Sequence, residues 1–465
     1  MASTEGLQRT IREVLLSPSG FAGLLIILSV LGLSIGALFY VPFDIVKEWN
    51  NPPFWQKYPR LAAPSWLSFF TGRNLPHSII LGEESFDMNE YNITSIGIKY
   101  ILLSAHFDYS YDDFPSEISA FLNVRYFESR PLATMKFIRP DGEEVILFHS
   151  VLSQANATLY LSVNEDVKTR IIEFLKRVGS DIPRNIYPEV VLFAAKGENM
   201  GDVSKLTVLK GRYRIRIEIT VTEPDVEAKA EVIIYGKVFG LAGTDSKRRD
   251  LLIGLVWGAP LALAFGLSAA IITSIVQSLM GALSAWYGGW VDEAIQRITD
   301  IYMIMPFLPI LITVSVVYKI DIWTLLSIVV VLSILGGLTK TARSMTLQVM
   351  AEQYVEAARS YGASRRRILF LYIMPRLMPY IVANIVLSVP AFVFLEAAMS
   401  ILGLGDPRVP TWGKIIGDAY EGGAAIHGFW WWILLPSLLI ILTAAAFAFL
   451  GYALDKVVNP RLRER

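Results

Sequence analysis

The sequence contains no cysteine among its 465 residues. That absence excludes disulfide bonds, thiolate metal sites and cysteine nucleophiles, while it leaves the redox environment of the protein open. Histidine is also scarce, and the four histidines are too scattered to form a recognisable site. Neither charge dominates, because 42 acidic residues balance 42 basic ones, so no overall field attracts nucleic acid or an acidic substrate. The stability of the fold must therefore come from packing.

Charge of either sign is sparse, since charged residues make up 18% of the chain against 53% hydrophobic residues, with a mean hydropathy of +0.46. A soluble enzyme carries more surface charge, so the composition predicts a membrane protein. A helix that crosses a hydrocarbon layer of roughly 30 Å needs about 20 largely uncharged residues. Six stretches meet this requirement and predict six transmembrane helices, at residues 21–41, 251–291, 301–318, 322–339, 377–404 and 428–454.

Two of these stretches allow more than one interpretation. Residues 21–41 could be the apolar core of a signal peptide, but they are longer than such cores usually are, which favours an uncleaved span. Residues 251–291 are long for one helix and yet lack a polar turn that would divide them. We interpret them as one span that enters through an interfacial segment and ends at an aromatic belt, residues 286–290.

The orientation follows from the basic residues of segment 340–376, where only Glu352 and Glu356 oppose them; they are Lys340, Arg343, Arg359, Arg365, Arg366, Arg367 and Arg376. The positive-inside rule makes this loop cytoplasmic. Six spans then place both termini in the cytoplasm and the polar block after the first span outside a plasma membrane. Residues 292–300 disagree with the rule, because their acidic side chains outnumber Arg297 in a loop that the count places inside.

Most of the polar residues that the spans lack lie in residues 44–250. Residues 212–221 alternate strictly between polar and apolar side chains, which predicts a half-buried strand, and residues 230–239 are also typical of β-structure. A hairpin is predicted at Asp141 and Gly142, and a helix at residues 165–178. We therefore predict an α+β or mainly β extracytoplasmic domain, inserted between the first and second helices. Its start, residues 50–70, is rich in Pro, Trp and Phe and resembles a membrane-proximal wrap.

The predicted insert offers only weak candidate sites. A row of three arginines could bind an anionic partner, although a solvated strand face is the favoured interpretation; the row is Arg212, Arg214 and Arg216. His106 and Asp108 would share one face of a strand, but two residues are a weak basis for a metal or catalytic site. Asn92 and Asn156 each begin an N-glycosylation sequon, a pattern short enough to arise by chance.

The basic segment contains a pattern that predicts a docking site for another protein. Glu356-Ala357-Ala358 is followed by Gly362, by the basic run 365–367, and then by Ile373-Met374-Pro375. This predicts a short helix, a glycine-permitted turn, and a second helix that Pro375 ends. The small alanines allow another backbone to approach, and an acid with several arginines, among them Arg365 and Arg366, can fix its register. The favoured interpretation is a docking site for a cytoplasmic partner, which transmits the partner's motion to the spans. The alternative is a basic cytoplasmic loop whose small residues have no such function.

This pattern resembles the coupling motif of binding-protein-dependent ABC importers, and more narrowly the second, C-type permease of the dipeptide, oligopeptide and nickel transporters. Further similar segments, in the same order, are residues 243–250, 287–297, 396–405, 410–413 and 455–461. Three departures stand out: Met374 replaces a leucine, Arg248 replaces a glycine, and the insert replaces a short external loop.

The resemblance implies a pathway shared with a second, related permease subunit, two ATPase subunits and an extracytoplasmic solute-binding protein, all assembled at the lipid bilayer. This chain lacks a phosphate-binding loop, so ATP and Mg are expected on the partner subunits, with no cofactor and no enzymatic activity here. The transported solute, whether a peptide, nickel or a sugar, stays open. Glu396 is the one acid inside a predicted span, and both a packing role and a role as pathway or gate remain open for it.

Together these features predict three parts: an N-terminal tail and first helix (1–43), the inserted domain (44–242), and a five-helix permease core (243–465) that carries the coupling loop, residues 340–376. The predicted function is that of a permease subunit of an ABC importer for di- or oligopeptides or a related solute. Two alternatives are a membrane-anchored receptor or enzyme that acts through the insert, and an ion-coupled secondary transporter.

Overall fold

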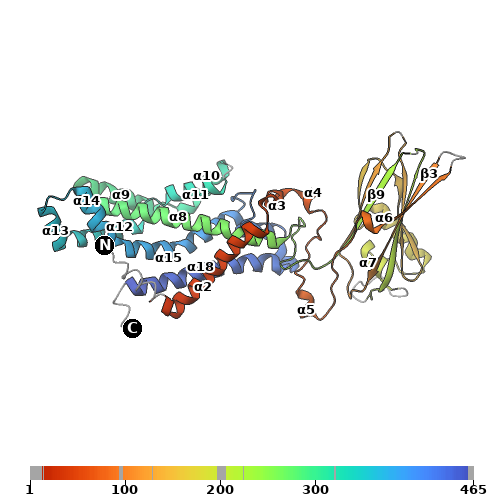
Figure 1. The fold of residues 1–465 in the computed structure, drawn as a ribbon, viewed down its shortest axis with the longest axis horizontal. Coiled ribbons are helices and arrows are strands. Elements are labelled where there is room, and N and C mark those ends of the chain that lie inside the picture. The colour runs from red at the N-terminus through yellow and green to blue at the C-terminus, as the bar shows by residue number, and fades with distance from the viewer. Residues whose placement is uncertain are drawn as a thin grey trace. The chain divides into compact units, whose positions relative to one another are not determined.

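The computed structural model describes residues 13–458, apart from residues 14, 94–97, 128, 196–205, 224, 319 and 320. The chain forms two compact units. One is Asn51–Leu252, which we call the inserted domain, and the other combines Met1–Asn50 with Ile253–Arg465 and is called the helical unit. In Figure 1 the strands belong to the inserted domain and the long helices to the helical unit.

The inserted domain consists of two antiparallel sheets. The four-stranded sheet has the order β1-β9-β4-β7, with β1 at Ile79–Leu81, β9 at Glu227–Tyr235, β4 at Glu117–Arg125 and β7 at Asn156–Tyr160. The five-stranded sheet has the order β2-β3-β8-β5-β6, with β2 at Asp87–Ile93, β3 at Ile98–Tyr109, β8 at Gly211–Val221, β5 at Leu132–Ile138 and β6 at Glu144–Val151. One buried cluster combines side chains from both sheets, so the mainly β alternative describes the domain.

Individual elements of this domain follow from the sequence pattern. Strand β8 buries alternate residues, including Tyr213 and Ile217, and so confirms the predicted strand. Strands β5 and β6 form the predicted hairpin, whose turn places Gly142 at φ +85°. The second predicted strand is displaced: β9 ends at Tyr235, because the backbone at Gly236 approaches Pro76 so closely that a Cβ would lie 2.3 Å from its carbonyl oxygen.

The helices of the inserted domain are short. Helix α6 (Glu165–Arg177) confirms the predicted helix; the Asn164 side chain caps its first turn, and its buried face packs against β6. Helix α7 is Pro188–Phe193, α4 is Pro52–Trp55 and α5 is Leu67–Thr71, and a 3-10 turn spans Glu83–Ser85. In the helical unit, α3 (Phe43–Lys47) and a 3-10 turn at Glu48–Asn50 follow the first long helix.

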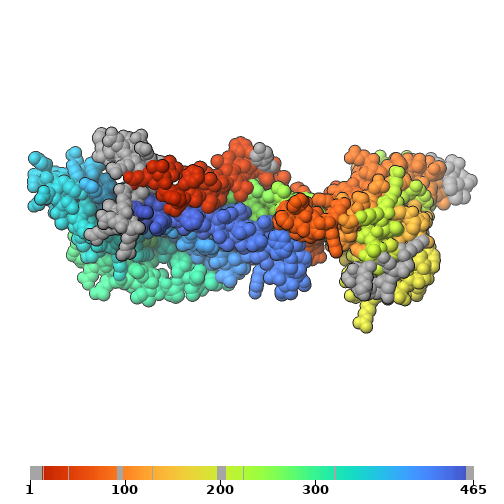
Figure 2. Space-filling view, turned by 90° about the horizontal axis from the view of Figure 1, so that it is seen from below, coloured from red at the N-terminus to blue at the C-terminus, as the bar shows by residue number. Residues whose placement is uncertain are grey.

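Four helices of the helical unit are long and apolar enough to cross a membrane: α2 (Pro18–Tyr40), α8 (Leu251–Tyr287), α15 (Met374–Ile401) and α18 (Trp430–Val458). Helix α2 lies along α18, as Figure 2 shows in red and dark blue. Their backbones approach closely at Gly23, where a Cβ would lie 2.7 Å from the Ala446 oxygen. Helix α8 is continuous, as predicted, and ends where Gly288 adopts φ +63°.

The predicted single helices at 301–318 and 322–339 are wrong, because each stretch is broken. Helices α9 (Gly289–Ile304) and α10 (Phe307–Val317) meet at 76°, and α11 (Ile322–Leu332) and α12 (Gly337–Met350) meet at 49°. Pro306 causes the first break, since a proline pushes the preceding residue out of the helical region. At the second break, Gln277 Nε2 donates to the Ser333 oxygen at 2.6 Å and satisfies a carbonyl at the helix end. The helical unit therefore has four candidate spans, or up to six if each bent pair is one span.

Candidate functional site

Helix α13 (Gln353–Ser360) carries the acidic and alanine part of the predicted motif and has two distinct faces. Val355 and Ala358 are buried, whereas Glu356 and Ala357 are exposed. The two alanines therefore differ in position. Ala358 packs against the other helices, whereas the small side chain of Ala357 lies on the exposed face beside the Glu356 carboxylate. Tyr361, directly after the helix, is 91% exposed.

The turn after α13 confirms the glycine-permitted turn predicted at Gly362. This residue has φ +77°, and a Cβ placed on it would meet no atom within 4 Å. Its N–H donates to the Arg359 oxygen at 2.9 Å, and the Ala363 N–H donates to the Ala358 oxygen at 3.0 Å. These two bonds form a Schellman motif, which ends a helix with a left-handed residue. Glycine is therefore needed for its backbone conformation and not for space.

The predicted helix end at Pro375 is wrong. Helix α14 (Arg365–Ile368) runs into a π-helical turn, Leu369–Ile373, and then into α15, so that Arg365–Ile401 is one helix of 37 residues. Pro375 lies in the first turn of α15. A proline disrupts regular α-helical bonding because it has no N–H and its ring meets the carbonyl four residues earlier. The wider bonding of the π-helical turn accommodates it. Arg365, Arg366 and Arg367 are exposed at the start of this helix.

The inner face of α13 is held by packing and by two cation–π contacts. Its buried residues join one cluster with side chains of α8, α12 and α15. The Arg359 guanidinium lies 5.0 Å from the ring of Trp286 on α8, and the Arg376 guanidinium lies 5.4 Å from the ring of Tyr354. A force applied to the outer face of α13 would therefore reach three other helices through direct contacts.

A group of ion pairs, which the sequence did not reveal, joins α12 to α9. The Arg343 Nε donates to Asp292 Oδ1 at 2.6 Å, and a second nitrogen donates to Oδ2 at 2.5 Å. The Ser284 hydroxyl on α8 also donates to Asp292, and Lys340 pairs with Asp300. Two of the acids that disagreed with the positive-inside rule, Asp292 and Asp300, thus pair with bases of the coupling loop. One feature of the sequence could have indicated these ion pairs: acidic residues are in excess at 292–300, and basic residues are in excess at 340–376.

Glu396 lies at a packed junction between helices. It is 3% exposed on α15, and the Ser400 hydroxyl donates to its Oε1 at 2.8 Å. Helix α16 (Trp412–Glu421) packs on this side, since a Cβ on Gly413 would lie 2.5 Å from the Ala397 Cα. The short helix α17 (Ala424–His427) follows. These contacts support the packing interpretation of Glu396.

In the segment before α8, Arg248 adopts a left-handed backbone conformation of the kind that favours glycine. Arg248 has φ +68°, which costs a non-glycine residue about 1 kcal/mol. Its guanidinium donates to the Tyr58 oxygen at 2.9 Å, pairs with Glu117 and lies 4.5 Å from the Tyr235 ring. These contacts offset the strain. Nearby, Asp250 caps α8 by accepting from the Leu252 N–H at 2.9 Å, and burial raises the pKa of this carboxyl to about 6.

The weaker candidates of the inserted domain do not converge on a site. The His106 ring contacts Arg214 at 2.5 Å, while Asp108 lies opposite Arg212 across the strands. Within the described residues, no three His, Asp or Glu side chains could hold a metal ion together. Asn156 begins β7 and is exposed. The Asn92 side chain and its sequon threonine lie outside the described residues, as does segment 459–461, and glycosylation stays a prediction at both sequons.

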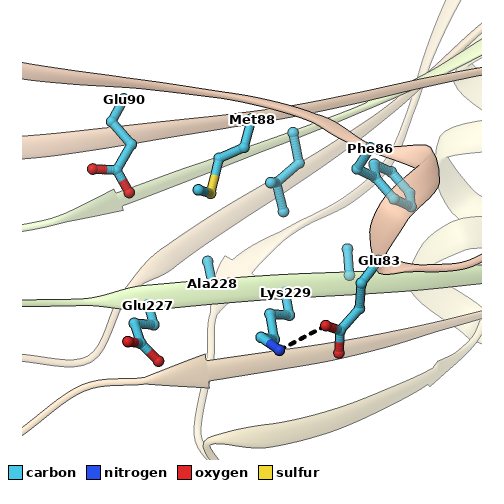
Figure 3. A pocket seen from close by; sticks show the side chains of 9 residues that line it. Glu83, Phe86, Met88, Glu90, Glu227, Ala228 and Lys229 are labelled. Carbon is cyan, nitrogen blue, oxygen red and sulfur yellow. Dashed lines mark hydrogen bonds and ion pairs between the residues drawn. The ribbon is translucent and has the colours of Figure 1, made fainter.

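A groove opens in the inserted domain between β2 and β9 (Figure 3). Its apolar lining is Phe86, Met88, Leu103, Ala228 and Ala230, and its charged lining is Glu83, Glu90, Glu227 and Lys229. In Figure 3 the labelled side chains of β2 face those of β9 across the groove, and Lys229 pairs with Glu83 at 2.6 Å. Strand β9 pairs with β4 along its whole length, but β1 covers only Val232–Ile234. Among the described strands, none pairs with this edge at 227–231.

The long apolar helices are typical of a multi-pass membrane protein. Residues 277–464 match the family of binding-protein-dependent transport system inner membrane components. The chain is 32% identical to the oligopeptide permease protein OppC of Bacillus subtilis, over 48% of this chain and 72% of the relative. It is 31% identical to the dipeptide permease protein DppC of B. subtilis (48% and 68%) and 30% identical to the glutathione permease protein GsiD of Pectobacterium atrosepticum (48% and 72%).

The chain belongs to this family and is a permease subunit of a binding-protein-dependent ABC importer of the plasma membrane. The sequence left three functions open, namely the permease and its two alternatives, and family membership selects the permease. These relatives are permease components of transport systems and not enzymes. The family match begins inside α8, so the inserted domain lies outside it.

Proposed function

We propose that this subunit imports a peptide or peptide-like solute and that ATPase subunits drive it through the outer face of the coupling loop. The observation that carries the second part is the two-faced helix α13: its inner face packs on three helices, while Glu356 and Ala357 face outward. Arg365 and Arg366 extend this exposed surface across the Gly362 turn. The names of the similar permeases support a peptide as solute.

The same proposal includes the expected assembly. A second related permease completes the pathway, two ATPase subunits hold ATP and Mg, and an external solute-binding protein delivers the solute. Six spans, with each bent helix pair counted as one, place both termini and the coupling loop in the cytoplasm. That arrangement puts the inserted domain outside, where solute is delivered, and agrees with the basic character of the coupling loop.

The docking of the ATPase is tested with two variants of the assembled transporter. Glu356→Ala is expected to weaken ATPase binding about 10-fold or more, because a hydrogen bond to a charged group contributes roughly 1.5–3 kcal/mol. Gly362→Pro is expected to abolish ATP-dependent uptake, since proline cannot adopt φ +77° and lacks the N–H that bonds Arg359. Copurification of the ATPase and uptake into vesicles are the measurements. Gln353→Ala, on the same helix and also exposed, is the matched control; unchanged uptake and ATPase binding in both test variants would sink the proposal.

For the inserted domain we propose docking of the solute-binding protein at the groove between β2 and β9. Three carboxylates and one ammonium line it, which favours a basic partner surface. The free edge of β9 at 227–231 offers main-chain groups to an extended segment of that partner. Glu90 and Glu227 are exposed, so both are accessible to it.

Reversing these charges tests the proposal. Glu90→Lys with Glu227→Lys is expected to raise the binding-protein concentration for half-maximal uptake about 10-fold, because charges at the rim of an interface mainly set encounter and register. The control is Glu165→Lys with Glu173→Lys, an equal charge change at exposed positions of α6. An equal shift in both double variants would show a general charge effect and contradict docking at the groove.

A further inference from the structure

The inserted domain carries an exposed aromatic patch, which we define as Trp66, Phe69, Phe70 and Leu241. Phe69 is 87% exposed, Phe70 75% and Leu241 66%. The rings contact edge to face, with centroids 5.8 Å apart for Trp66 and Phe70 and 5.6 Å for Phe69 and Phe70. Trp66 Nε1 donates to the Leu241 oxygen at 2.9 Å. The patch is thus an ordered structure whose apolar surface faces outward, an arrangement that marks a contact surface.

The chain path ties this patch to the beginning of a membrane helix. The Ser65 N–H donates to the Gly240 oxygen at 2.9 Å, and the N–H of Leu251, the first residue of α8, donates to the Gly243 oxygen at 3.1 Å. Only Ala242 separates Leu241 from Gly243, so two Cα–Cα steps join them. At 3.8 Å per residue, the backbone of Leu241 lies within about 13 Å of the first residue of α8.

The level of that residue relative to the bilayer follows from α2. Its 23 residues span about 34 Å, close to the thickness of one hydrocarbon layer. At its end, the Val41 oxygen accepts from Trp257 Nε1 of α8 at 3.1 Å. Leu251 precedes Trp257 by six residues, or about 9 Å along the helix. The headgroup region of each leaflet is about 5–8 Å thick, so Leu251 lies near its outer limit. The chain of about 13 Å between Leu251 and Leu241 is long enough for the patch to reach this region.

The chemistry of the patch and its flanks fits the same environment. Tryptophan is enriched at the level of the lipid headgroups, where an apolar ring and a polar N–H are both accommodated. Arg73, two residues after α5, and Lys247 are exposed basic side chains that suit the phosphate groups of lipid headgroups. We propose that the aromatic patch inserts into the headgroup region of the adjacent leaflet and anchors the inserted domain to lipid. This proposal depends on the membrane helices and not on the coupling or docking proposed above.

The absence of cysteine allows a direct test with the full chain in lipid nanodiscs. Phe69→Cys, labelled with an environment-sensitive fluorophore, is expected to show a blue-shifted emission and at least threefold stronger quenching by headgroup-proximal spin-labelled lipid than Val163→Cys. Val163 is 67% exposed and follows β7 at the edge of the four-stranded sheet, which makes it a matched control. Equal quenching at the two positions would overturn the proposal.

A second experiment distinguishes lipid from a protein as the partner that contacts the aromatic patch. A label at Leu241→Cys should be quenched by the same lipid, and adding Phe69→Ser with Phe70→Ser should reduce that quenching at least twofold without a change in thermal stability. If the Leu241 label instead became shielded only when the second permease subunit was added, with no quenching by lipid, the patch would be a subunit contact and the proposal would be wrong.

Discussion

Reversing the charge of Arg343 is expected to reduce ATP-dependent uptake at least 10-fold, and reversing Asp292 should do the same. The two side chains form a bidentate pair between α12, where the coupling loop begins, and α9. They are partly buried, with Arg343 34% and Asp292 19% exposed. A charge-assisted pair of this kind contributes about 1.5–3 kcal/mol, and a shift of that size changes the balance of two conformations 10- to 150-fold.

The exchange of both charges, Arg343→Asp with Asp292→Arg, should restore a substantial part of the uptake that each single variant loses. Uptake and ATP hydrolysis by the reconstituted transporter are the measurements. Glu293 and Arg297 supply the control, since they form a pair at 3.7 Å on the same helix α9 and are 71% and 76% exposed; reversing them should leave uptake within twofold. Failure of the exchanged pair to exceed the single variants would show that the two residues act separately.

Replacing Gly281 by alanine is expected to destabilise the helical unit by about 1–3 kcal/mol or more, the usual cost of overpacking. A Cβ on Gly281 of α8 would lie 2.2 Å from the Thr339 oxygen and 2.9 Å from the Arg343 nitrogen. Both are backbone atoms of α12, so no side chain can move aside. The added methyl would push α12 away from α8 and weaken the packing beneath the coupling loop.

The matched control is Gly337→Ala, because Gly337 opens α12 and a Cβ there would meet no atom within 4 Å. Alanine should stabilise that position by up to about 1 kcal/mol, given its higher helix propensity. Thermal unfolding of the purified chain, followed by the recovery of monodisperse protein, separates the two variants. An equal midpoint for Gly281→Ala and Gly337→Ala would show that α8 and α12 do not pack as closely as described.

In the coupling loop, some structural features follow from neighbouring residues and others from contacts between residues distant in the sequence. Gly362 was predictable because only its left-handed backbone conformation matters, which is a local property. The course of the chain after it was not: Pro375 suggested a helix end, yet a π-helical turn carries the helix into α15. Helix continuity across a proline depends on how the neighbouring turn is bonded, and that is decided by packing against other helices.

Sequence alone determined that the chain is apolar enough for a membrane, which segments are uncharged, where bases gather, and that a hairpin turns at Asp141 and Gly142. These are properties of composition and of neighbouring residues. Only the tertiary structure decided that α9–α10 and α11–α12 bend, that Ala358 faces inward and Ala357 outward, and that Asp292 pairs with Arg343. Residues 292 and 343 are far apart in sequence, and the free energy of bringing such groups together comes from the packing of whole helices, which no local pattern encodes.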